Sequence, residues 1–335
     1  MKVLHLPYNP AGQMSSQALA LRKAGIEASF CSYGSNVFKY PTDIRSPIAN
    51  QSTATGQKNA IRAFMTDAME RYDIFHFHGA LTFSNSYQYS DLPLLADRKK
   101  IMNFWGSEVR RLSIAKRSNP YNRVKHTDEA AIVKRLKLLS KHFQHVIVPD
   151  YEIYEYVKDF FPNIHTVRYV VDHERIAPVY PDPAKPRPLV VHAPSDPYLK
   201  GTEFVLRAVE NLHSKIDFDF EFIQKMPHEK ALRRYAQADI IVDQLCIGVY
   251  SILSIESMLM GKPVITYIRP DLQEHYPSDL PIVSASPDTI ESTLQDLLLN
   301  PERRRELGMK GREYAMKYHA PEVIAQRLID VYNQL

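Results

Sequence analysis

The sequence predicts an α/β protein made of two doubly wound domains. Short apolar runs alternate with segments of helical periodicity along the whole chain, which is the pattern of a parallel sheet covered by helices. A length of 335 residues suits two domains better than one. Five prolines lie in PVYPDPAKPRP, residues 178–188. Because proline fixes φ and lacks a backbone donor, this stretch is neither a helix nor a central strand and marks the boundary between the domains.

The predicted organisation is an N-terminal domain over 1–178, a proline-rich linker over 179–188, a C-terminal domain over 189–320 and a terminal helix over 321–335. The first domain has predicted strands over 1–6, 26–32, 73–78, 101–105 and 145–149, with helices over 15–24 and 57–71. The second has predicted strands over 189–192, 218–222, 239–243 and 264–268, with helices over 202–213, 228–236 and 254–260. The amphipathic terminal helix either closes the second domain or crosses back to the first.

Composition excludes several classes of protein. No apolar run approaches the roughly 18 residues of a membrane span, and the first residues, MKVLHLPYNPAG, do not read as a signal peptide. The two cysteines, Cys31 and Cys246, stand far apart, which excludes a disulfide framework or a cysteine-built metal site. We therefore expect a cytoplasmic protein.

The net charge of +4 conceals one basic block. Residues Arg98–Lys141 hold thirteen Lys/Arg and three acids, a balance of +10, so the rest of the chain carries −6. The block is either a solvated helical face or a surface that makes a peripheral contact with the inner face of an anionic membrane. Nucleic acid is not an expected partner, because the block has no interleaved aromatic residues and matches no known module.

The first candidate site is the loop between a strand and a helix in VVHAPSDPYLKGTEFVLRAVENL. Such loops border the ligand crevice of a parallel sheet, and the helix N-terminus that follows favours an anion. Ser195, Lys200 and Gly201 lie in this loop. Lys200 could neutralise a phosphate while Gly201 lets the backbone come close. A Lys-Gly pair before a helix is also common without any ligand.

A second loop-to-helix segment follows in ADIIVDQLCIGVYSILSIESMLMGKPVITY. Its loop contains Gly248, Tyr250 and Ser251, and its helix carries Glu256. A carboxylate there could accept two hydrogen bonds from a ribose diol. The alternative is a surface glutamate favoured by the helix dipole, although the neighbours of Glu256 are apolar.

These pieces, in this order, resemble the retaining glycosyltransferases of family 4. The resemblance rests on HAPS…KGT, PHEK…ADIIVDQ and IESMLMGKPVI in the second half, and on PYNPAGQ…LRKAGIEA, DIFHFHG and NFWGSEVRR in the first. It implies the GT-B fold, in which two Rossmann-like doubly wound domains face each other across a cleft. The N-terminal domain would bind the acceptor and the C-terminal domain the nucleotide sugar.

The resemblance also implies roles for individual residues. Lys200 would contact the diphosphate and Glu256 the ribose. Because Trp105 stands where many relatives have a histidine, His78, at the end of the strand in DIFHFHG, is the expected catalytic imidazole of the crevice; the alternative is a structural histidine that hydrogen-bonds to the backbone. The remaining donor-binding residues would be Gly12, Gln13, Ser195, Gly201, Lys225, Met226, Gly248, Val249, Tyr250, Ser251 and Ile252. Trp105, Glu108 and Arg110 would bind the acceptor; alternatively, Glu108 and Arg110 pair with each other at the surface.

The expected reaction is transfer of a sugar from a nucleoside diphosphate sugar, UDP-sugar being favoured, to an acceptor hydroxyl with retained configuration. The acceptor would be a carbohydrate or a lipid-linked molecule, in bacterial polysaccharide, glycolipid or other glycoconjugate synthesis. No metal or other cofactor is expected. The Asp-x-Asp in DFDFEF, residues 217–222, alternates with phenylalanine as in a strand with one buried face.

Three departures from the family pattern keep other functions open. Gly248 stands where the family has the first of two glutamates, Ser195 where it usually has an arginine, and Trp105 where many relatives have a histidine. The alternatives are a catalytically weak or inactive nucleotide-sugar-binding protein and a nucleotide-sugar epimerase. A Rossmann oxidoreductase is disfavoured, because PYNPAGQMSS lacks the G-x-G-x-x-G pattern.

Overall fold

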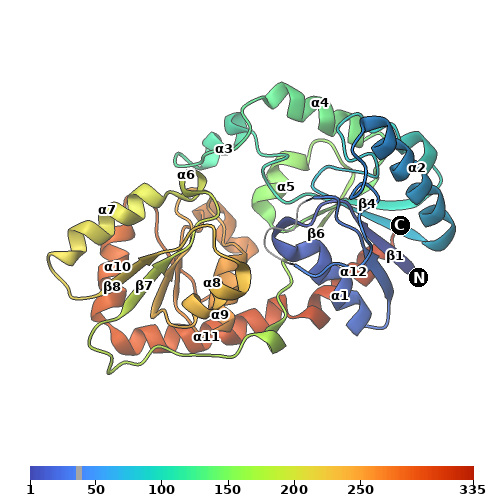
Figure 1. Ribbon diagram of the computed structural model, residues 1–335. Coiled ribbons are helices and arrows are strands. Elements are labelled where there is room, and N and C mark those ends of the chain that lie inside the picture. The colour runs from blue at the N-terminus through green and yellow to red at the C-terminus, as the bar shows by residue number, and fades with distance from the viewer. Residues whose placement is uncertain (35–39) are drawn as a thin grey trace. The chain divides into compact units, whose positions relative to one another are not determined.

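The computed structural model describes residues 1–34 and 40–335, which form two compact units (Figure 1). Unit 1 comprises Met1–Arg111, His126–Val170 and Pro321–Leu335, and unit 2 comprises Leu112–Lys125 and Val171–Ala320. Each unit is built on a parallel sheet. The predicted α/β class with two doubly wound, Rossmann-like domains is confirmed. Within the described residues, no helix has the length and apolar character that a membrane span requires.

Unit 1 contains a six-stranded parallel sheet in the order β2-β1-β3-β4-β5-β6. The strands are β1 Lys2–Leu6, β2 Glu27–Phe30, β3 Ile74–His78, β4 Lys99–Asn103, β5 His145–Val148 and β6 Asn163–Thr166. The helices are α1 Gln13–Lys23, α2 Ala54–Arg71, α4 Glu129–Leu139, α5 Tyr151–Val157 and α12 Pro321–Tyr332, with short 3-10 turns at Pro10–Gly12 and Leu92–Leu95.

Unit 2 contains a five-stranded parallel sheet in the order β11-β10-β9-β7-β8. The strands are β7 Leu189–His192, β8 Asp219–Phe222, β9 Ile240–Val242, β10 Val264–Thr266 and β11 Val283–Ser284. The helices are α3 Leu112–Ser118, α6 Pro197–Lys200, α7 Thr202–His213, α8 His228–Tyr235, α9 Ile252–Leu259, α10 Ile290–Leu299 and α11 Pro301–His319, with 3-10 turns at His173–Arg175 and Pro270–His275.

The terminal helix α12 belongs to the core of unit 1. Its apolar face buries Ile324, Leu328 and Tyr332 in one cluster with Val3 of β1 and Met14 of α1. Burying a side chain of this size stabilises a fold by roughly 1.5–3 kcal/mol. The amphipathic pattern at 321–332 is therefore explained by packing against helix α1.

The division of the chain differs from the predicted domains in two further places. Residues 112–125 pack with unit 2 although they precede β5 of unit 1, because their polar side chains hydrogen-bond to unit 2. The segment 179–188 also packs within unit 2. The Val179 amide donates to the Met260 carbonyl at 2.8 Å, and Lys185 pairs with Asp239 at 2.5 Å.

Both sheets have a point where the strand order reverses. In unit 2 it lies between β7 and β9, which are neighbours although β8 separates them in sequence. Loops leaving the carboxyl ends of two such strands diverge to opposite faces and open a crevice, which is the usual ligand position in open α/β sheets. The loops after β7 and β9 are the two that sequence reasoning singled out.

Candidate functional site

Lys200 lies at the end of the short helix that follows β7. The Asp196 side chain caps this helix by accepting from the Leu199 amide at 3.1 Å, and Gly201 ends it with φ +76°. A Cβ at position 201 would lie 2.7 Å from the Cys246 sulfur. Glycine is therefore required both by its positive φ and by the close approach of the loop after β9.

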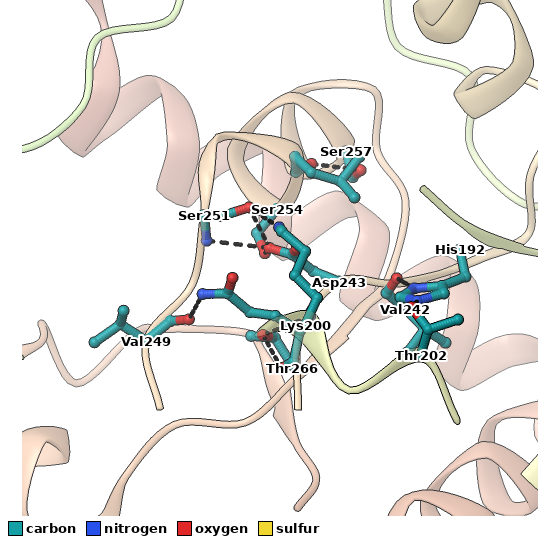
Figure 2. A network of polar contacts seen from close by, with 12 residues as sticks. His192, Lys200, Thr202, Val242, Asp243, Val249, Ser251, Ser254, Ser257 and Thr266 are labelled. Atoms are coloured by element: carbon teal, nitrogen blue, oxygen red, sulfur yellow. Dashed lines mark hydrogen bonds and ion pairs between the residues drawn. The ribbon is translucent and has the colours of Figure 1, made fainter. Parts of the chain in front are cut away.

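The Lys200 ammonium is paired with Asp243, the first residue after β9. Their Nζ and Oδ1 atoms are 2.6 Å apart, and Nζ also lies 3.2 Å from the Ser251 hydroxyl (Figure 2). Lys200 is 8% exposed and Asp243 is fully buried. The site therefore holds a buried ion pair, and loss of one partner would leave an uncompensated charge.

Asp243 also organises the start of helix α9. Its Oδ2 accepts hydrogen bonds from the Ser251 amide at 3.1 Å, the Ser251 hydroxyl at 2.6 Å and the Ser254 hydroxyl at 2.6 Å (Figure 2). Burial alone would raise the pKa of Asp243, but the Lys200 charge and these hydrogen bonds outweigh it and lower the pKa below its ordinary value. The carboxylate therefore stays charged, and the Ser251 amide, predicted to bind phosphate, is already engaged.

The loop between β9 and α9 turns its carbonyl groups toward partners in the protein. Each carbonyl of residues 246–249 accepts a hydrogen bond: Cys246 and Ile247 from the Asn119 side chain, Gly248 from the Arg269 amide, and Val249 from the Gln244 side chain. These residues are buried.

The amide N–H groups of the same four residues have no acceptor in the part of the chain that the structure describes. Cys246, Ile247, Gly248 and Val249 donate to none of the residues in 1–34 and 40–335. Gly248 has φ +96°, the kind of backbone conformation that successive amides adopt around an anion. Buried N–H groups nearly always have a partner, so this loop has the donors expected of an anion-binding loop.

Glu256 lies on the second turn of α9 and is 7% exposed. Its Oε1 accepts a hydrogen bond at 2.6 Å from Nε2 of His228, the first residue of α8. This hydrogen bond raises the pKa of His228. The carboxylate that is predicted to bind the ribose is therefore hydrogen-bonded to an imidazole.

The side chains of other predicted donor residues are placed differently. The Tyr250 hydroxyl contacts His319 Nε2 at 2.9 Å, so only its backbone belongs to the loop. Ile252 and Met226 are half-buried, and Ser195 and Lys225 are exposed. Asp217 and Asp219 are also exposed and share Arg187 as an ion-pair partner.

In unit 1 the predicted residues Gly12 and Gln13 end the first loop. Gly12 adopts φ +77°, and Gln13 begins α1 with its side chain buried. The Gln13 amide group donates to the Val170 carbonyl and accepts from the Val170 amide, both at 2.9 Å. The side chain thus fixes the segment that leaves β6, and a contact of residues 12–13 with the sugar phosphate remains a prediction.

His78, the predicted imidazole of the crevice, lies inside a cluster of three histidines in unit 1, and its part in catalysis stays a prediction. It is fully buried with His5 and His76, and its Nε2 lies 3.1 Å from His5 Nδ1. His76 Nδ1 lies 2.7 Å from the Tyr332 hydroxyl. Burial lowers the pKa of all three histidines, that of His76 to about 3. They are the one group among the described residues with a spacing that could hold a metal ion, but they already hydrogen-bond to each other and to Tyr332.

The predicted acceptor residues make structural contacts in unit 1. Trp105 is half-buried and stacks on His78 with ring centroids 5.8 Å apart. Glu108 accepts from the Trp105 amide at 2.5 Å and the Gly106 amide at 3.0 Å, so it caps its own loop. Arg110 makes a bidentate pair with Glu152, at 2.7 Å for the closest atoms. Glu108 and Arg110 therefore do not pair with each other.

Sequence reasoning missed how the site is held together. None of Asp243, His228 and Asn119 is among the residues that the motifs predicted for the site. One signal was present for Asp243: an acid that ends a strand, followed by two serines at the start of the next helix. Nothing in the sequence indicates the contact of Asn119 with residues 246 and 247, which are more than a hundred positions away.

Comparison with known structures shows the class of fold. Sucrose-phosphate synthase from Thermosynechococcus elongatus matches with a TM-score of 0.66 and 16% identity over 100% of this chain and 99% of that one. HepE from Anabaena, in complex with UDP-glucose, gives 0.65 and 13% over 100% of both chains. UDP-GlcNAc 2-epimerase from Neisseria meningitidis gives 0.58 and 14% over 100% of both chains. The chain has the GT-B fold.

The second part of the chain also matches a known sequence family. Residues 200–330, which include Lys200, Asp243 and Glu256, match the family described as glycosyl transferase-like. The resemblance to GT-B glycosyltransferases that the motifs indicated is therefore confirmed. No curated protein sequence matches the chain.

Proposed function

We propose that the protein is a glycosyltransferase that moves a sugar from a UDP-sugar to an acceptor hydroxyl with retained configuration. The observation that carries this proposal is the buried loop 246–249, whose four amides have no acceptor in the described part of the chain, beside the Lys200 ammonium. Backbone donors and a cation at the end of a parallel strand suit the two phosphates of a nucleoside diphosphate.

The comparisons support the same donor class. The family matched by residues 200–330 is glycosyl transferase-like, and the Anabaena HepE structures contain UDP, glucose or UDP-glucose. Glu256 supplies the carboxylate that a ribose diol requires, provided that the ribose displaces His228 from it.

The proposed chemistry uses few groups of the protein. The bond between the anomeric carbon and the diphosphate oxygen breaks, the acceptor oxygen bonds to the same face of that carbon, and negative charge grows on the leaving diphosphate. Lys200 and the loop amides stabilise that charge because they are already oriented and largely shielded from water. The leaving phosphate takes the proton of the acceptor hydroxyl, so the scheme needs neither a separate general base nor a metal ion.

The acceptor in this proposal is a carbohydrate or lipid-linked molecule of polysaccharide, glycolipid or other glycoconjugate synthesis, handled in the cytoplasm. The basic block 98–141 would provide the peripheral contact with an anionic membrane. Six of the thirteen Lys and Arg side chains in the block are hydrogen-bonded or ion-paired within the protein: Lys100, Arg110, Arg111, Lys116, Arg123 and Arg135. The other seven would face the membrane surface in this proposal.

The proposal is tested by nucleotide binding followed by turnover. Thermal unfolding is recorded with UDP, GDP, ADP, TDP and CMP, for the wild type and for Glu256→Gln, with the exposed Glu210→Gln of α7 as the matched control. A ligand at about 100 times its Kd stabilises the folded state by roughly 2.7 kcal/mol. We expect a shift with UDP in the wild type and in Glu210→Gln that Glu256→Gln loses. No shift with any nucleotide would refute the donor site.

A second candidate function is that of a nucleotide-sugar-binding protein with weak or no turnover. It is favoured by the glycine at position 248, where the family has a glutamate. A Cβ there would lie 2.6 Å from Cγ of Arg269, so the Arg269 side chain packs over the place where the family's first glutamate would begin. Bound UDP-glucose that stays intact with a panel of acceptors would support this candidate. Conversion of the donor without any acceptor would instead indicate an epimerase, an activity borne by one structure of the same fold.

A further inference from the structure

Residues 112–125, here called the crossing segment, connect two parts of unit 1 but pack within unit 2. The segment consists of helix α3 and the seven residues after it. It leaves unit 1 after Arg111 and re-enters it at His126, two crossings additional to those at residues 170–171 and 320–321. The family match over residues 200–330 does not include it.

The buried contact of this segment is Asn119. Its side chain is fully buried, and its Nδ2 donates to the carbonyls of Cys246 and Ile247 at 2.9 and 3.0 Å. Its Oδ1 accepts from the Tyr121 amide at 3.1 Å, which fixes the orientation of the amide group. The two amide protons of Asn119 are thus donated to two successive carbonyls of the loop 246–249.

Two further residues anchor the segment on either side of that loop. The Tyr121 hydroxyl hydrogen-bonds to Asp288, and its ring packs edge-on against Tyr267. Arg123 donates to the Tyr198 carbonyl of α6 at 2.8 Å, pairs with Glu203 of α7 and lies over the Tyr198 ring at 4.5 Å. The segment therefore contacts α6, which carries Lys200, and α7, which begins after Gly201, as well as the loop itself.

We propose that Asn119 is a positioning residue for the loop 246–249 and sets its affinity for a diphosphate. A peptide plane that turns its carbonyl toward Asn119 points its N–H in the opposite direction. Holding the carbonyls of residues 246 and 247 therefore orients the N–H groups of residues 247 and 248, two of the four donors that lack an acceptor among the described residues. An amide oriented before the ligand arrives saves the ordering cost on binding. The effect on affinity rests on the proposed function, whereas the effect on the loop does not.

Hydrogen exchange in the ligand-free protein and calorimetric binding of UDP and of inorganic pyrophosphate test the proposal. The variants are Asn119→Ala and the isosteric Asn119→Asp, which cannot donate to carbonyls. Asn122→Ala is the matched control, because Asn122 is 1% exposed in the same segment and its side chain has no partner among the described residues. Exchange is read at the amides of Leu245, Ser251 and Arg269, whose hydrogen bonds tie the loop to its surroundings.

We expect both Asn119 variants to exchange these three amides at least tenfold faster and to bind UDP and pyrophosphate at least tenfold more weakly than Asn122→Ala, at matched Tm. Equal exchange and equal affinity in the Asn119 and Asn122 variants would overturn the proposal. If wild-type protein binds neither probe while Asn119→Ala still loosens the loop, the proposed function fails and the positioning role stands. Should both Asn119 variants fail to fold, Arg123→Ala must show faster exchange at the same amides, and unchanged exchange would overturn the proposal.

Discussion

Acidification from pH 7 to pH 5 should destabilise unit 1, because three histidines are buried there without charge. His5, His76 and His78 are fully buried, and burial lowers the pKa of each. In the unfolded chain they titrate near 6.5. Below about pH 6.5 the unfolded state therefore binds more protons than the folded state. The free energy of unfolding is greatest above that pH and falls as the pH drops below it.

The magnitude follows from the pKa of His76, which is about 3 in the folded state. One pKa unit corresponds to about 1.36 kcal/mol, so a single histidine with this pKa loses about 2 kcal/mol of folding free energy between pH 7 and pH 5. His5 and His78 are shifted in the same direction. The expected loss for the cluster is therefore between about 2 and about 6 kcal/mol.

Urea unfolding followed by tryptophan fluorescence measures this loss, because Trp105 is the only tryptophan of the chain and stacks on His78. His76→Asn should reduce the loss by about 2 kcal/mol, since its amide does not titrate. His126→Gln, at an exposed position, is the control and should keep the wild-type slope. A wild-type loss below about 1 kcal/mol, or the same slope in His76→Asn, would refute the reasoning.

Three further predictions concern packing and ligand binding. Gly308→Ala places a Cβ against the Gly261 carbonyl and should cost about 1–3 kcal/mol in urea unfolding, whereas Gly34→Ala, with nothing among the described residues within 4 Å of its Cβ, should cost little. Leu328→Ala, fully buried in α12, should destabilise unit 1 by about 2–5 kcal/mol by the same measurement, and a loss under 1 kcal/mol would contradict its place in the core. UDP binding measured by calorimetry should strengthen as the pH rises from 6 to 8, because deprotonation of His228, whose pKa is raised, frees Glu256; His228→Ala should abolish that dependence.

Secondary structure was predictable where apolar periodicity and proline or glycine boundaries agree. Strand β7 and helix α7 have the predicted bounds, 189–192 and 202–213. Strand β6, Asn163–Thr166, was not predicted because its side chains are mostly polar and half-buried at the edge of the sheet. Edge strands gain their stability from one neighbour and need no apolar alternation.

The candidate site was predictable only as separate pieces. Lys200 stands out because it comes just before a predicted helix, and Glu256 because it is a carboxylate among apolar residues on another. The pairing of Lys200 with Asp243 depends on β7 and β9 being neighbours in the sheet. The local periodicity of the sequence does not predict that strand order. The same limit applies to His5, which meets His76 and His78 only because β1 pairs with β3.

The return of α12 to unit 1 has a consequence for how the protein is made. A ribosome completes α1 and the six strands of unit 1 long before it reaches Pro321, and it synthesises nearly all of unit 2 in between. Until α12 emerges, the apolar surface of α1 that it covers is open to chaperones and to other nascent chains. Unit 1 therefore cannot finish folding first, although it is translated first, and a fragment ending at residue 178 should require α12 supplied as a separate peptide to become soluble.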